Sequence, residues 1–379
     1  MRDPRPGPGR VNGRASRRGL LAGALGPLVA GPARAMRAQG PGMGALAAAK
    51  GVVFGTALTR GEAEASPELA GIAGAEAALI VPGNEFKWPS HRPSLEGFDF
   101  RDADFMVRFA EERRKPARGH ALVWHGALPA WFEAAAPRDA AGMRGLLERH
   151  IRTVAGRYAG RMQSWDVVNE PVEPWYRRPD GLRETPFLQA LGPDYIDLAF
   201  RLAHAADPAA RLVLNEYGLE MANEDNAARR VAMLALLRGM RSRGVPVHAL
   251  GIQGHLSAAA RDFDPQVFRR FIRDVAALGL EVYVTELDVT DRGLPPDIPA
   301  RDAAVARTLR AFLDAALAEP AVRMVVVWGL TDRFTWMNDS QYTRREDGLR
   351  VRGHLLDEAL RPKAGWHAVA DAFRAAPRR

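Results

Sequence analysis

Two glutamates, Glu170 and Glu286, lie at or near the ends of short valine-rich runs, "QSWDVVNE" (163–170) and "EVYVTEL" (281–287). A carboxylate is costly to bury unless it is paired, and Pro171 cannot continue the hydrogen-bond ladder of a strand. Taken alone, each glutamate is compatible with a surface carboxylate at a turn. A pair that faced one cleft could instead donate a proton and attack the substrate or activate water.

Polar and aromatic side chains also gather at the ends of other apolar runs. One or two such ends would mean little, because loops are usually polar, but here they occur at seven of eight runs. Amide, imidazole and ammonium groups bind hydroxyls, and tryptophan rings stack on the apolar faces of sugars. With two facing carboxyls they predict glycoside hydrolysis. Trp165 lies within a run and is assigned to the core. The set at the ends comprises Asn84, Lys87, Trp88, His120, Trp124, His125, Asn169, Asn215, Glu216, Tyr217, Gln253, His255, Asp288, Trp328, Asp332 and Trp336.

Eight runs of β-branched or apolar residues are predicted to be strands. Several lack polar–apolar alternation, as expected of parallel strands buried on both faces. Between them lie helical stripes with apolar residues at i, i+3, i+4 and i+7, such as Met233, Leu236, Leu237 and Met240. This alternation predicts an α/β protein with a single (β/α)8 TIM barrel. The predicted strands cover residues 52–58, 77–84, 117–124, 163–170, 211–217, 249–256, 281–287 and 323–330.

The catalytic barrel is predicted over residues 49–376. Barrel chemistry lies at the carboxyl ends of the strands, and an eight-strand ring places its fourth and seventh strands on opposite sides. Glu170 and Glu286 are therefore expected to face each other across its mouth. The alternative fold, a doubly wound open sheet, would normally show a Gly-rich phosphate turn after its first strand, and the sequence has none there.

Three histidines, His120, His125 and His255, could also be read as metal ligands. The spacing of the first two matches no zinc pattern, and the sequence contains no His-Glu-x-x-His run. We therefore predict no metal and no other cofactor.

The net charge of +8 is concentrated in the first 35 residues, which hold seven arginines and one acid and so carry +6 of it. The small balance on the remainder does not indicate a nucleic-acid partner, and no apolar run is long enough to span a membrane. The stretch "SRRGLLAGALGPLVAGPARA" has paired arginines, an apolar middle and a small-x-small end. It predicts a twin-arginine-type signal peptide over residues 1–35. A disordered basic tail is the alternative.

Residues 36–48 are predicted to form a disordered leader ahead of the barrel. The mature protein is then expected to be exported, either periplasmic or secreted, and not bound to a membrane. The chain has no cysteine, so its fold contains no disulfide.

Six stretches, in chain order, resemble the strand-end motifs of glycoside hydrolase family 10, the endo-β-1,4-xylanases. They are "RGHALVWH", "WDVVNEP", "LNEYGLE", "GIQGHL", "VTELDVT" and "VVWGLTDRFTW". The likeness runs from about Gly51 to "LRPKAGW" near residue 366. Some of these motifs also mark a wider group of barrel glycosidases, but the ordered set is specific.

The resemblance implies a retaining enzyme that cleaves internal β-1,4-xylosidic bonds of xylan or xylo-oligosaccharides, with Glu170 as general acid/base and Glu286 as nucleophile. It implies that Asn169 holds the 2-hydroxyl of the −1 sugar, and that His255 contacts Glu286 with Asp288 behind it. An imidazole beside Glu286 should keep it ionised, and that charge should favour a protonated Glu170. A monomer is expected. The implied substrate-binding residues are Asn84, Lys87, His120, Trp124, Gln253, Trp328 and Trp336.

Two positions depart from the family pattern in a way that bears on substrate binding. Gly83 stands where the family usually has Glu, and Ala127 stands where it usually has Gln. Both missing side chains would hydrogen-bond the −2 sugar, so we expect a weaker grip on plain xylose there, or room for a substituted one. Phe86, where Met is usual, is a smaller change.

Three other functions remain open from the sequence. A related barrel glycosidase could act on another β-glycan or on an aryl-xyloside. A non-catalytic glycan-binding protein would be expected to lack a catalytic carboxylate, yet both glutamates remain. A phosphate-handling barrel would need a Gly-rich loop after its last strands, and "DVTDRGLPPD" does not resemble one.

Overall fold

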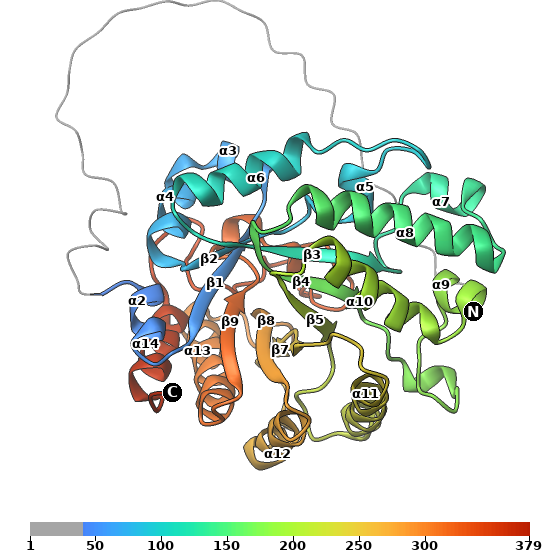
Figure 1. Cartoon of the computed structure of the whole chain (residues 1–379). Helices are drawn as coiled ribbons and strands as arrows, with labels where there is room; N and C mark the ends of the chain where they lie inside the picture. Colours follow the sequence, from blue (N-terminus) through green and yellow to red (C-terminus); the bar gives the residue numbers. More distant parts are fainter. Residues whose placement is uncertain (1–40) are drawn as a thin grey trace, which may run out of the picture.

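The computed structural model describes residues 41–379, so the predicted signal peptide lies outside the described residues. Eight parallel strands pair in chain order, and β9 pairs with β1 to close the ring, as predicted (Figure 1). These strands are β1 (Val53–Leu58), β2 (Leu79–Pro82), β3 (Ala117–Trp124), β4 (Met162–Asn169), β5 (Arg211–Glu216), β6 (Ala249–Ile252), β8 (Glu281–Thr290) and β9 (Val322–Val327).

One predicted strand is divided in two. The run 249–256 forms β6 and, after a break, the short strand β7 (His255–Ser257), which pairs with β8. Gly254 lies between them with a φ of +77°, a left-handed conformation that interrupts an extended strand. The break turns His255 away from the line of β6 and onto the edge of β8.

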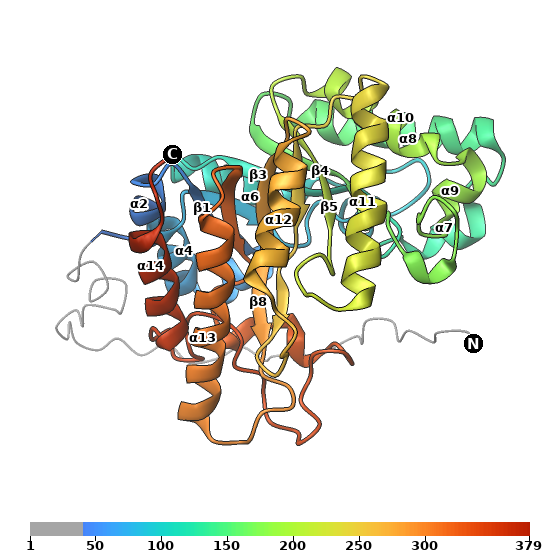
Figure 2. The same ribbon diagram turned by 90° about the horizontal axis from the view of Figure 1, so that it is seen from below.

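Helices cover the outside of the ring, and in Figure 2 α11, α12, α13 and α14 run alongside the strands. In the described part of the chain, no helix has the length and apolar character needed to cross a membrane. The helices of the barrel are α3 (Arg60–Ala65), α4 (Pro67–Glu76), α5 (Trp88–His91), α6 (Arg101–Glu112), α7 (Ala130–Ala135), α8 (Ala140–Arg157), α9 (Pro186–Leu191), α10 (Asp194–Ala206), α11 (Glu224–Ser242), α12 (Pro265–Ala276), α13 (Ile298–Leu317) and α14 (Ala364–Ala375), with short 3-10 turns η1 (Pro174–Tyr176), η2 (Asp332–Phe334) and η3 (Trp336–Asn338).

Helix α12 illustrates how the sequence sets an element. Asp264 caps its first turn by accepting hydrogen bonds from the N–H groups of Gln266 and Val267, and Pro265 occupies the first helical position. The helix buries Phe268, Phe271, Ile272 and Val275 against the barrel. Burying side chains of this size stabilises the fold by roughly 1.5–3 kcal/mol each.

The core has two layers. Outward-facing strand residues pack beneath the helices, and a separate cluster fills the interior of the ring under the carboxyl ends of the strands. This inner cluster forms an apolar layer beneath the residues at the carboxyl ends of the strands. It comprises Ala57, Leu79, Val81, Val213, Ala249, Tyr283, Met324 and Val326.

The segment predicted as a disordered leader is ordered from residue 43 onward. Residues 43–48 form helix α2 (Met43–Ala48), and the N–H of Met43 donates to Oε2 of Glu76 at 2.7 Å. Met43 and Ala47 are buried, which anchors the helix to the barrel. The leader prediction is therefore wrong for these residues, because two apolar side chains spaced one helical turn apart provide a packing face.

Trp88, expected in the cleft from its place after the second strand, belongs to the core. It is 1% exposed, stacks on His150 with ring centroids 3.9 Å apart, and donates its indole N–H to the carbonyl of Leu122 at 2.6 Å. The guanidinium of Arg92 lies 4.9 Å from its ring, and His91 lies beside His150. This cluster supports the turn that carries Lys87.

The buried histidines of this cluster predict a loss of stability in acid. Burial, with a contribution from Arg92, lowers the pKa of His91 to about 4, and burial lowers the pKa of His150 well below its ordinary value. Between about pH 6.5 and pH 4 the unfolded chain binds protons that the folded chain does not. The free energy of unfolding should therefore fall as pH drops through that window, on the order of 3 kcal/mol from His91 alone.

A His91→Phe variant tests this origin. It keeps a ring beside Phe98 and Phe100, whose centroids lie 6.5 and 6.0 Å from that of His91, and removes the titrating group. Between pH 7 and pH 4.5 its free energy of unfolding in urea should fall by about 2 kcal/mol less than that of the wild type. His367→Phe, at an exposed position of α14, is the control. Equal falls in His91→Phe and the wild type would contradict the prediction.

Candidate active site

Glu170 and Glu286 come to the same mouth of the ring from opposite strands. Glu170 directly follows β4. Glu286 was predicted near the end of a strand that stopped at residue 287, but β8 continues to Thr290, so Glu286 lies inside it. The pairing of β8 with β9 shifts register between Val284 and Leu287. Such an irregularity re-aims a side chain. Glu286 is 5% exposed.

Two amides join the carboxyls of Glu170 and Glu286 in one hydrogen-bonded chain. Asn215, on β5, donates through Nδ2 to Oε1 of Glu286 at 2.7 Å and to Oδ1 of Asn169 at 2.8 Å. Asn169 in turn donates to Oε1 of Glu170 at 3.3 Å. The hydroxyl of Thr285 donates to Oδ1 of Asn215 at 2.6 Å, which fixes that amide. The glutamates therefore belong to a single site.

Two imidazoles and an ammonium group act on the carboxylate of Glu286. Nε2 of His255 lies 3.4 Å from Oε2, and Nδ1 of His120 lies 3.8 Å from Oε1. Burial alone would raise the pKa of Glu286, but His120, His255 and Lys87 outweigh it and lower this pKa to about 2. Glu286 is therefore an anion at neutral pH.

His255 is held from behind by Asp288. Its Nδ1 lies 2.8 Å from Oδ1 of Asp288, whose other oxygen accepts the indole N–H of Trp336 at 2.7 Å. Burial would lower the pKa of His255, but Asp288 and Glu286 outweigh it and raise this pKa well above its ordinary value. The chain Trp336–Asp288–His255–Glu286 thus fixes the ring.

His120 has an equivalent support that the sequence reasoning missed. Its Nδ1 lies 2.9 Å from Oδ2 of Asp166, and the other oxygen of that carboxylate accepts a hydrogen bond from Arg118. Arg118 also donates to Oγ of Ser164 at 2.8 Å. All three partners are buried in β3 and β4. Their only signal in the sequence was polarity within strands that should be apolar.

The carboxyl of Glu170 is held by two further donors. Nε1 of Trp124 donates to Oε2 at 2.9 Å, and Nε2 of Gln253 donates to Oε1 at 3.0 Å. The backbone of Glu170 is left-handed, with a φ of +57°. For a residue with a β-carbon this conformation costs on the order of 1 kcal/mol or more, and such strain is concentrated at functional sites.

The remaining predicted binding residues form the rim of the site. Nζ of Lys87 donates to Oδ1 of Asn84 at 2.8 Å, and it lies 5.5 Å from the ring of Trp124 and 5.8 Å from that of Trp328. Burial lowers the pKa of Lys87, while Glu286 opposes the shift. The indoles and Lys87 therefore form one aromatic and cationic wall beside Glu286.

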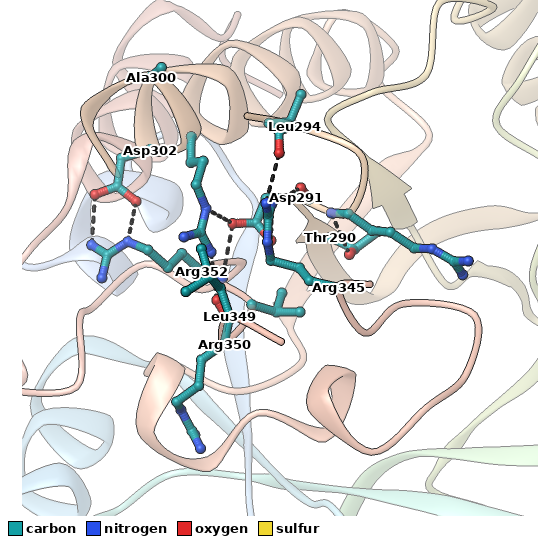
Figure 3. A network of polar contacts seen from close by, with 12 residues as sticks. Thr290, Asp291, Leu294, Ala300, Asp302, Arg345, Leu349, Arg350 and Arg352 are labelled. Atoms are coloured by element: carbon teal, nitrogen blue, oxygen red, sulfur yellow. Dashed lines mark hydrogen bonds and ion pairs between the residues drawn. The ribbon is translucent and has the colours of Figure 1, made fainter. Parts of the chain in front are cut away.

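The segment after Trp336 is tied to the segment after β8, as Figure 3 shows. Arg345 donates to the carbonyls of Asp291 at 2.6 Å and Leu294 at 2.7 Å. Arg352 forms two hydrogen bonds with Asp302, at 2.9 and 2.7 Å. These bonds fix the chain on either side of the site.

Asp332, expected at the site from its place after the last strand, is used elsewhere. Its Oδ2 accepts a hydrogen bond from Nζ of Lys363 at 2.7 Å, and its Oδ1 accepts from the N–H of His354 at 3.0 Å. It therefore holds the chain that leads to α14. Within residues 41–379, no three or more His, Asp or Glu side chains are grouped as they would be to hold a metal ion.

Comparison with known proteins places this geometry in a family. A sequence profile of Glycosyl hydrolase family 10 matches residues 42–372. The chain belongs to glycosyl hydrolase family 10. It is 32% identical over 268 residues to endo-1,4-beta-xylanase B of Thermotoga neapolitana, which is 70% of this chain and 73% of that relative.

Solved structures of family 10 share the fold. Native xylanase 10B from Thermotoga maritima superposes with a TM-score of 0.79 at 30% identity, covering 88% of this chain and 98% of that chain. Xylanase 10B from Thermotoga petrophila RKU-1, in complex with xylobiose, gives a TM-score of 0.80 at 29% identity with the same coverage. The barrel and the family assignment therefore agree.

Position 83, where the resemblance implies a glutamate, is a glycine. Glu85, two residues further along the chain, does not substitute for that carboxylate, because its oxygens accept the N–H groups of Arg60 at 2.7 Å and Asn84 at 3.1 Å. A β-carbon on Gly83 would lie 3.1 Å from Cγ2 of Thr59, a close but adjustable contact. A side chain at position 83 therefore requires Thr59 to move by a few tenths of an ångström.

Proposed function

We propose that this chain is a retaining endo-1,4-β-xylanase that hydrolyses internal bonds of xylan and xylo-oligosaccharides. The observation that carries the proposal is that two glutamates from opposite strands share one hydrogen-bonded site. His120, His255 and Lys87 keep Glu286 anionic, and Asn215 and Asn169 link it to Glu170. Family membership and the xylanase names of its relatives support the same substrate.

In the first step, Glu286 attacks the anomeric carbon of the −1 xylose. Glu170 gives its proton to the departing glycosidic oxygen, so the C1–O bond breaks as an ester bond to Glu286 forms. The leaving chain departs as a neutral alcohol. His255 and Asp288 hold the nucleophile in the required orientation.

In the second step, Glu170 is an anion and takes a proton from water. That water attacks the same carbon, and the carboxylate of Glu286 is released. Glu170 can serve as the base here because the charge of Glu286 is neutralised in the ester. Two inversions restore the β-configuration at the anomeric carbon.

The rim residues bind the sugar in this proposal. Asn169 holds the 2-hydroxyl of the −1 xylose. Trp328, Trp336, His120 and Gln253 enclose the same sugar, and Asn84, Lys87 and Trp124 bind it and the −2 sugar through hydroxyl and ring contacts.

A second candidate is a related glycosidase for another β-glycan or an aryl-xyloside, and it is kept open by Gly83 and Ala127 in the expected −2 region. A reducing-sugar assay on xylan, arabinoxylan, carboxymethylcellulose and small aryl glycosides tests both. Xylan should be cleaved with an early fall in viscosity, the mark of internal cleavage. Activity confined to aryl glycosides, or highest on carboxymethylcellulose, would favour the second candidate.

Restoring the two missing side chains should tighten the −2 subsite. Gly83→Glu and Ala127→Gln should each lower KM for xylotriose about two- to thirteen-fold, the effect of one hydrogen bond of about 0.5–1.5 kcal/mol. Ala135→Gln, at an exposed position of α7, is the matched control. An unchanged KM in both variants would show that these positions do not set the −2 subsite.

We propose further that residues 1–35 are a twin-arginine-type export signal and that the mature enzyme acts as a monomer outside the cytoplasm. The paired Arg17 and Arg18 ahead of an apolar stretch support export. Mass spectrometry of the exported protein, with Arg17→Lys/Arg18→Lys as the comparison, tests the signal. Light scattering tests the oligomeric state.

A further inference from the structure

The segment 170–173, which leaves β4 with Glu170, follows a strained backbone path that needs external support. Glu170 has a φ of +57°, a region that residues with a β-carbon rarely adopt. Its N–H donates to the carbonyl of Asn215 at 2.8 Å, and its carbonyl accepts a hydrogen bond from Nε of Arg183 at 2.9 Å. A strained residue persists only where its surroundings determine its conformation.

Arg183 donates hydrogen bonds to three successive carbonyls of this segment, those of Glu170, Pro171 and Val172. Besides the bond to Glu170, its Nη2 donates to the carbonyl of Val172 at 3.2 Å, and its backbone N–H donates to the carbonyl of Pro171 at 2.7 Å. Arg183 is 8% exposed and comes from the far end of the long loop that follows β4. One residue therefore fixes three successive peptide groups.

Arg183 is in turn held by a buried cluster. Its Nη2 donates to the hydroxyl of Tyr217 at 2.8 Å and lies 3.1 Å from Oε2 of Glu173. Arg229, on α11, binds the other oxygen of Glu173 at 2.9 Å and also donates to the carbonyl of Val172. A guanidinium with several of its donors occupied in this way is a rigid fork. The hydrogen bonds of Arg183 and Arg229 run to backbone carbonyls, Tyr217 and Glu173, and the proposed reaction gives the two arginines no direct role.

We propose that Arg183 is a positioning residue for proton transfer: by fixing the backbone of Glu170, it aims the carboxyl of Glu170 at the departing glycosidic oxygen. This inference rests on the proposed function, in which Glu170 is the acid. A general acid must lie within hydrogen-bond reach of the atom that it protonates, and a displacement of about 1 Å can cost about a hundred-fold in rate. Trp124 and Gln253 hold the carboxyl, whereas Arg183 sets the point from which that side chain starts.

An Arg183→Met variant tests the proposal through its dependence on the leaving group. On phenyl β-xylobioside, whose leaving group needs a proton, kcat/KM should fall about ten- to a hundred-fold. On dinitrophenyl β-xylobioside, whose phenolate leaves without a proton, the first-step rate should change less than about two-fold. A merely structural role would lower both rates by the same factor.

Arg178→Met is the matched control. Arg178 lies in the same loop but pairs with Asp180 at 3.0 Å and Glu184 at 2.7 Å, away from the backbone of Glu170. The rates of Arg178→Met on phenyl and dinitrophenyl β-xylobioside should equal those of the wild type.

Arg183→Lys keeps the charge but not the fork, and should show the same selective loss to a smaller degree. A folded Arg183→Met variant should unfold cooperatively. If it does not, the ratio of the rates on phenyl and dinitrophenyl β-xylobioside is measured with Arg183→Lys instead. Equal losses on both substrates, or no loss on either, would overturn the inference. A wild-type protein that cleaves neither xylan nor the xylobiosides would instead refute the proposed function, so the two failures are distinguishable.

Discussion

Replacing Glu286 with alanine should abolish turnover on xylan and on activated aryl xylobiosides alike. The reason is that no other described side chain combines the position and the anionic charge that His120, His255 and Lys87 give this carboxylate. Loss of a covalent nucleophile typically costs roughly 10⁵-fold or more in kcat. Circular dichroism and thermal unfolding should remain close to those of the wild type, since His255 keeps its contact with Asp288.

Azide provides the sharpest readout for this variant. It can enter the space left by Glu286→Ala and attack the β-linked substrate directly, with Glu170 protonating the leaving group. A single inversion then gives the α-xylobiosyl azide. Glu281→Ala, at the opposite end of β8, is the control and should keep wild-type kcat. Normal xylan hydrolysis by Glu286→Ala would refute the assignment of the nucleophile.

Replacing Glu170 with alanine should give the second large effect, with a different pattern. Xylan hydrolysis should fall about 10²- to 10⁴-fold, the usual contribution of a general acid or base. The first step on dinitrophenyl β-xylobioside should be nearly unaffected, because that leaving group needs no proton. The second step should stall, because no base then activates water, and the xylobiosyl ester on Glu286 should accumulate.

Mass spectrometry of Glu170→Ala incubated with dinitrophenyl β-xylobioside should detect the ester. Added azide should release it as the β-xylobiosyl azide, since two inversions have then occurred. Glu184→Ala, in the same loop, is the control. Normal xylan hydrolysis by Glu170→Ala, or failure of azide to accelerate turnover of dinitrophenyl β-xylobioside, would show that Glu170 is not the acid/base.

The barrel was predictable because its strands are buried on both faces and its helices carry regular apolar stripes. The stripe of Met233, Leu236, Leu237 and Met240 predicted a face of α11 that is buried at three of these four positions. Local deviations were not predictable. The break at Gly254 and the extension of β8 beyond Glu286 depend on backbone conformation and on pairing with a neighbouring strand. Helix α2 depends on a contact with Glu76, 33 residues away.

At the site, the sequence indicated the residues that end strands but not those that hold them. Glu170, His255 and Trp336 stood out as polar or aromatic residues after apolar runs. Trp88 had the same signal, yet it packs in the core, because residue type after a strand does not reveal which way a side chain points. Asp166 acts through His120, which is distant in the sequence. Arg183 acts through a hydrogen bond to the backbone carbonyl of Glu170. A single sequence does not show which residues such side chains bind.

The most direct test of the account is the anomeric form of the first product. Proton NMR should follow hydrolysis of xylohexaose by the wild-type enzyme on a timescale faster than mutarotation. Double displacement by Glu286 and Glu170 predicts that the new reducing end appears first as the β-anomer and converts to α only later. Initial formation of the α-anomer would mean a single displacement by water, and it would contradict the assignment of Glu286 as a nucleophile.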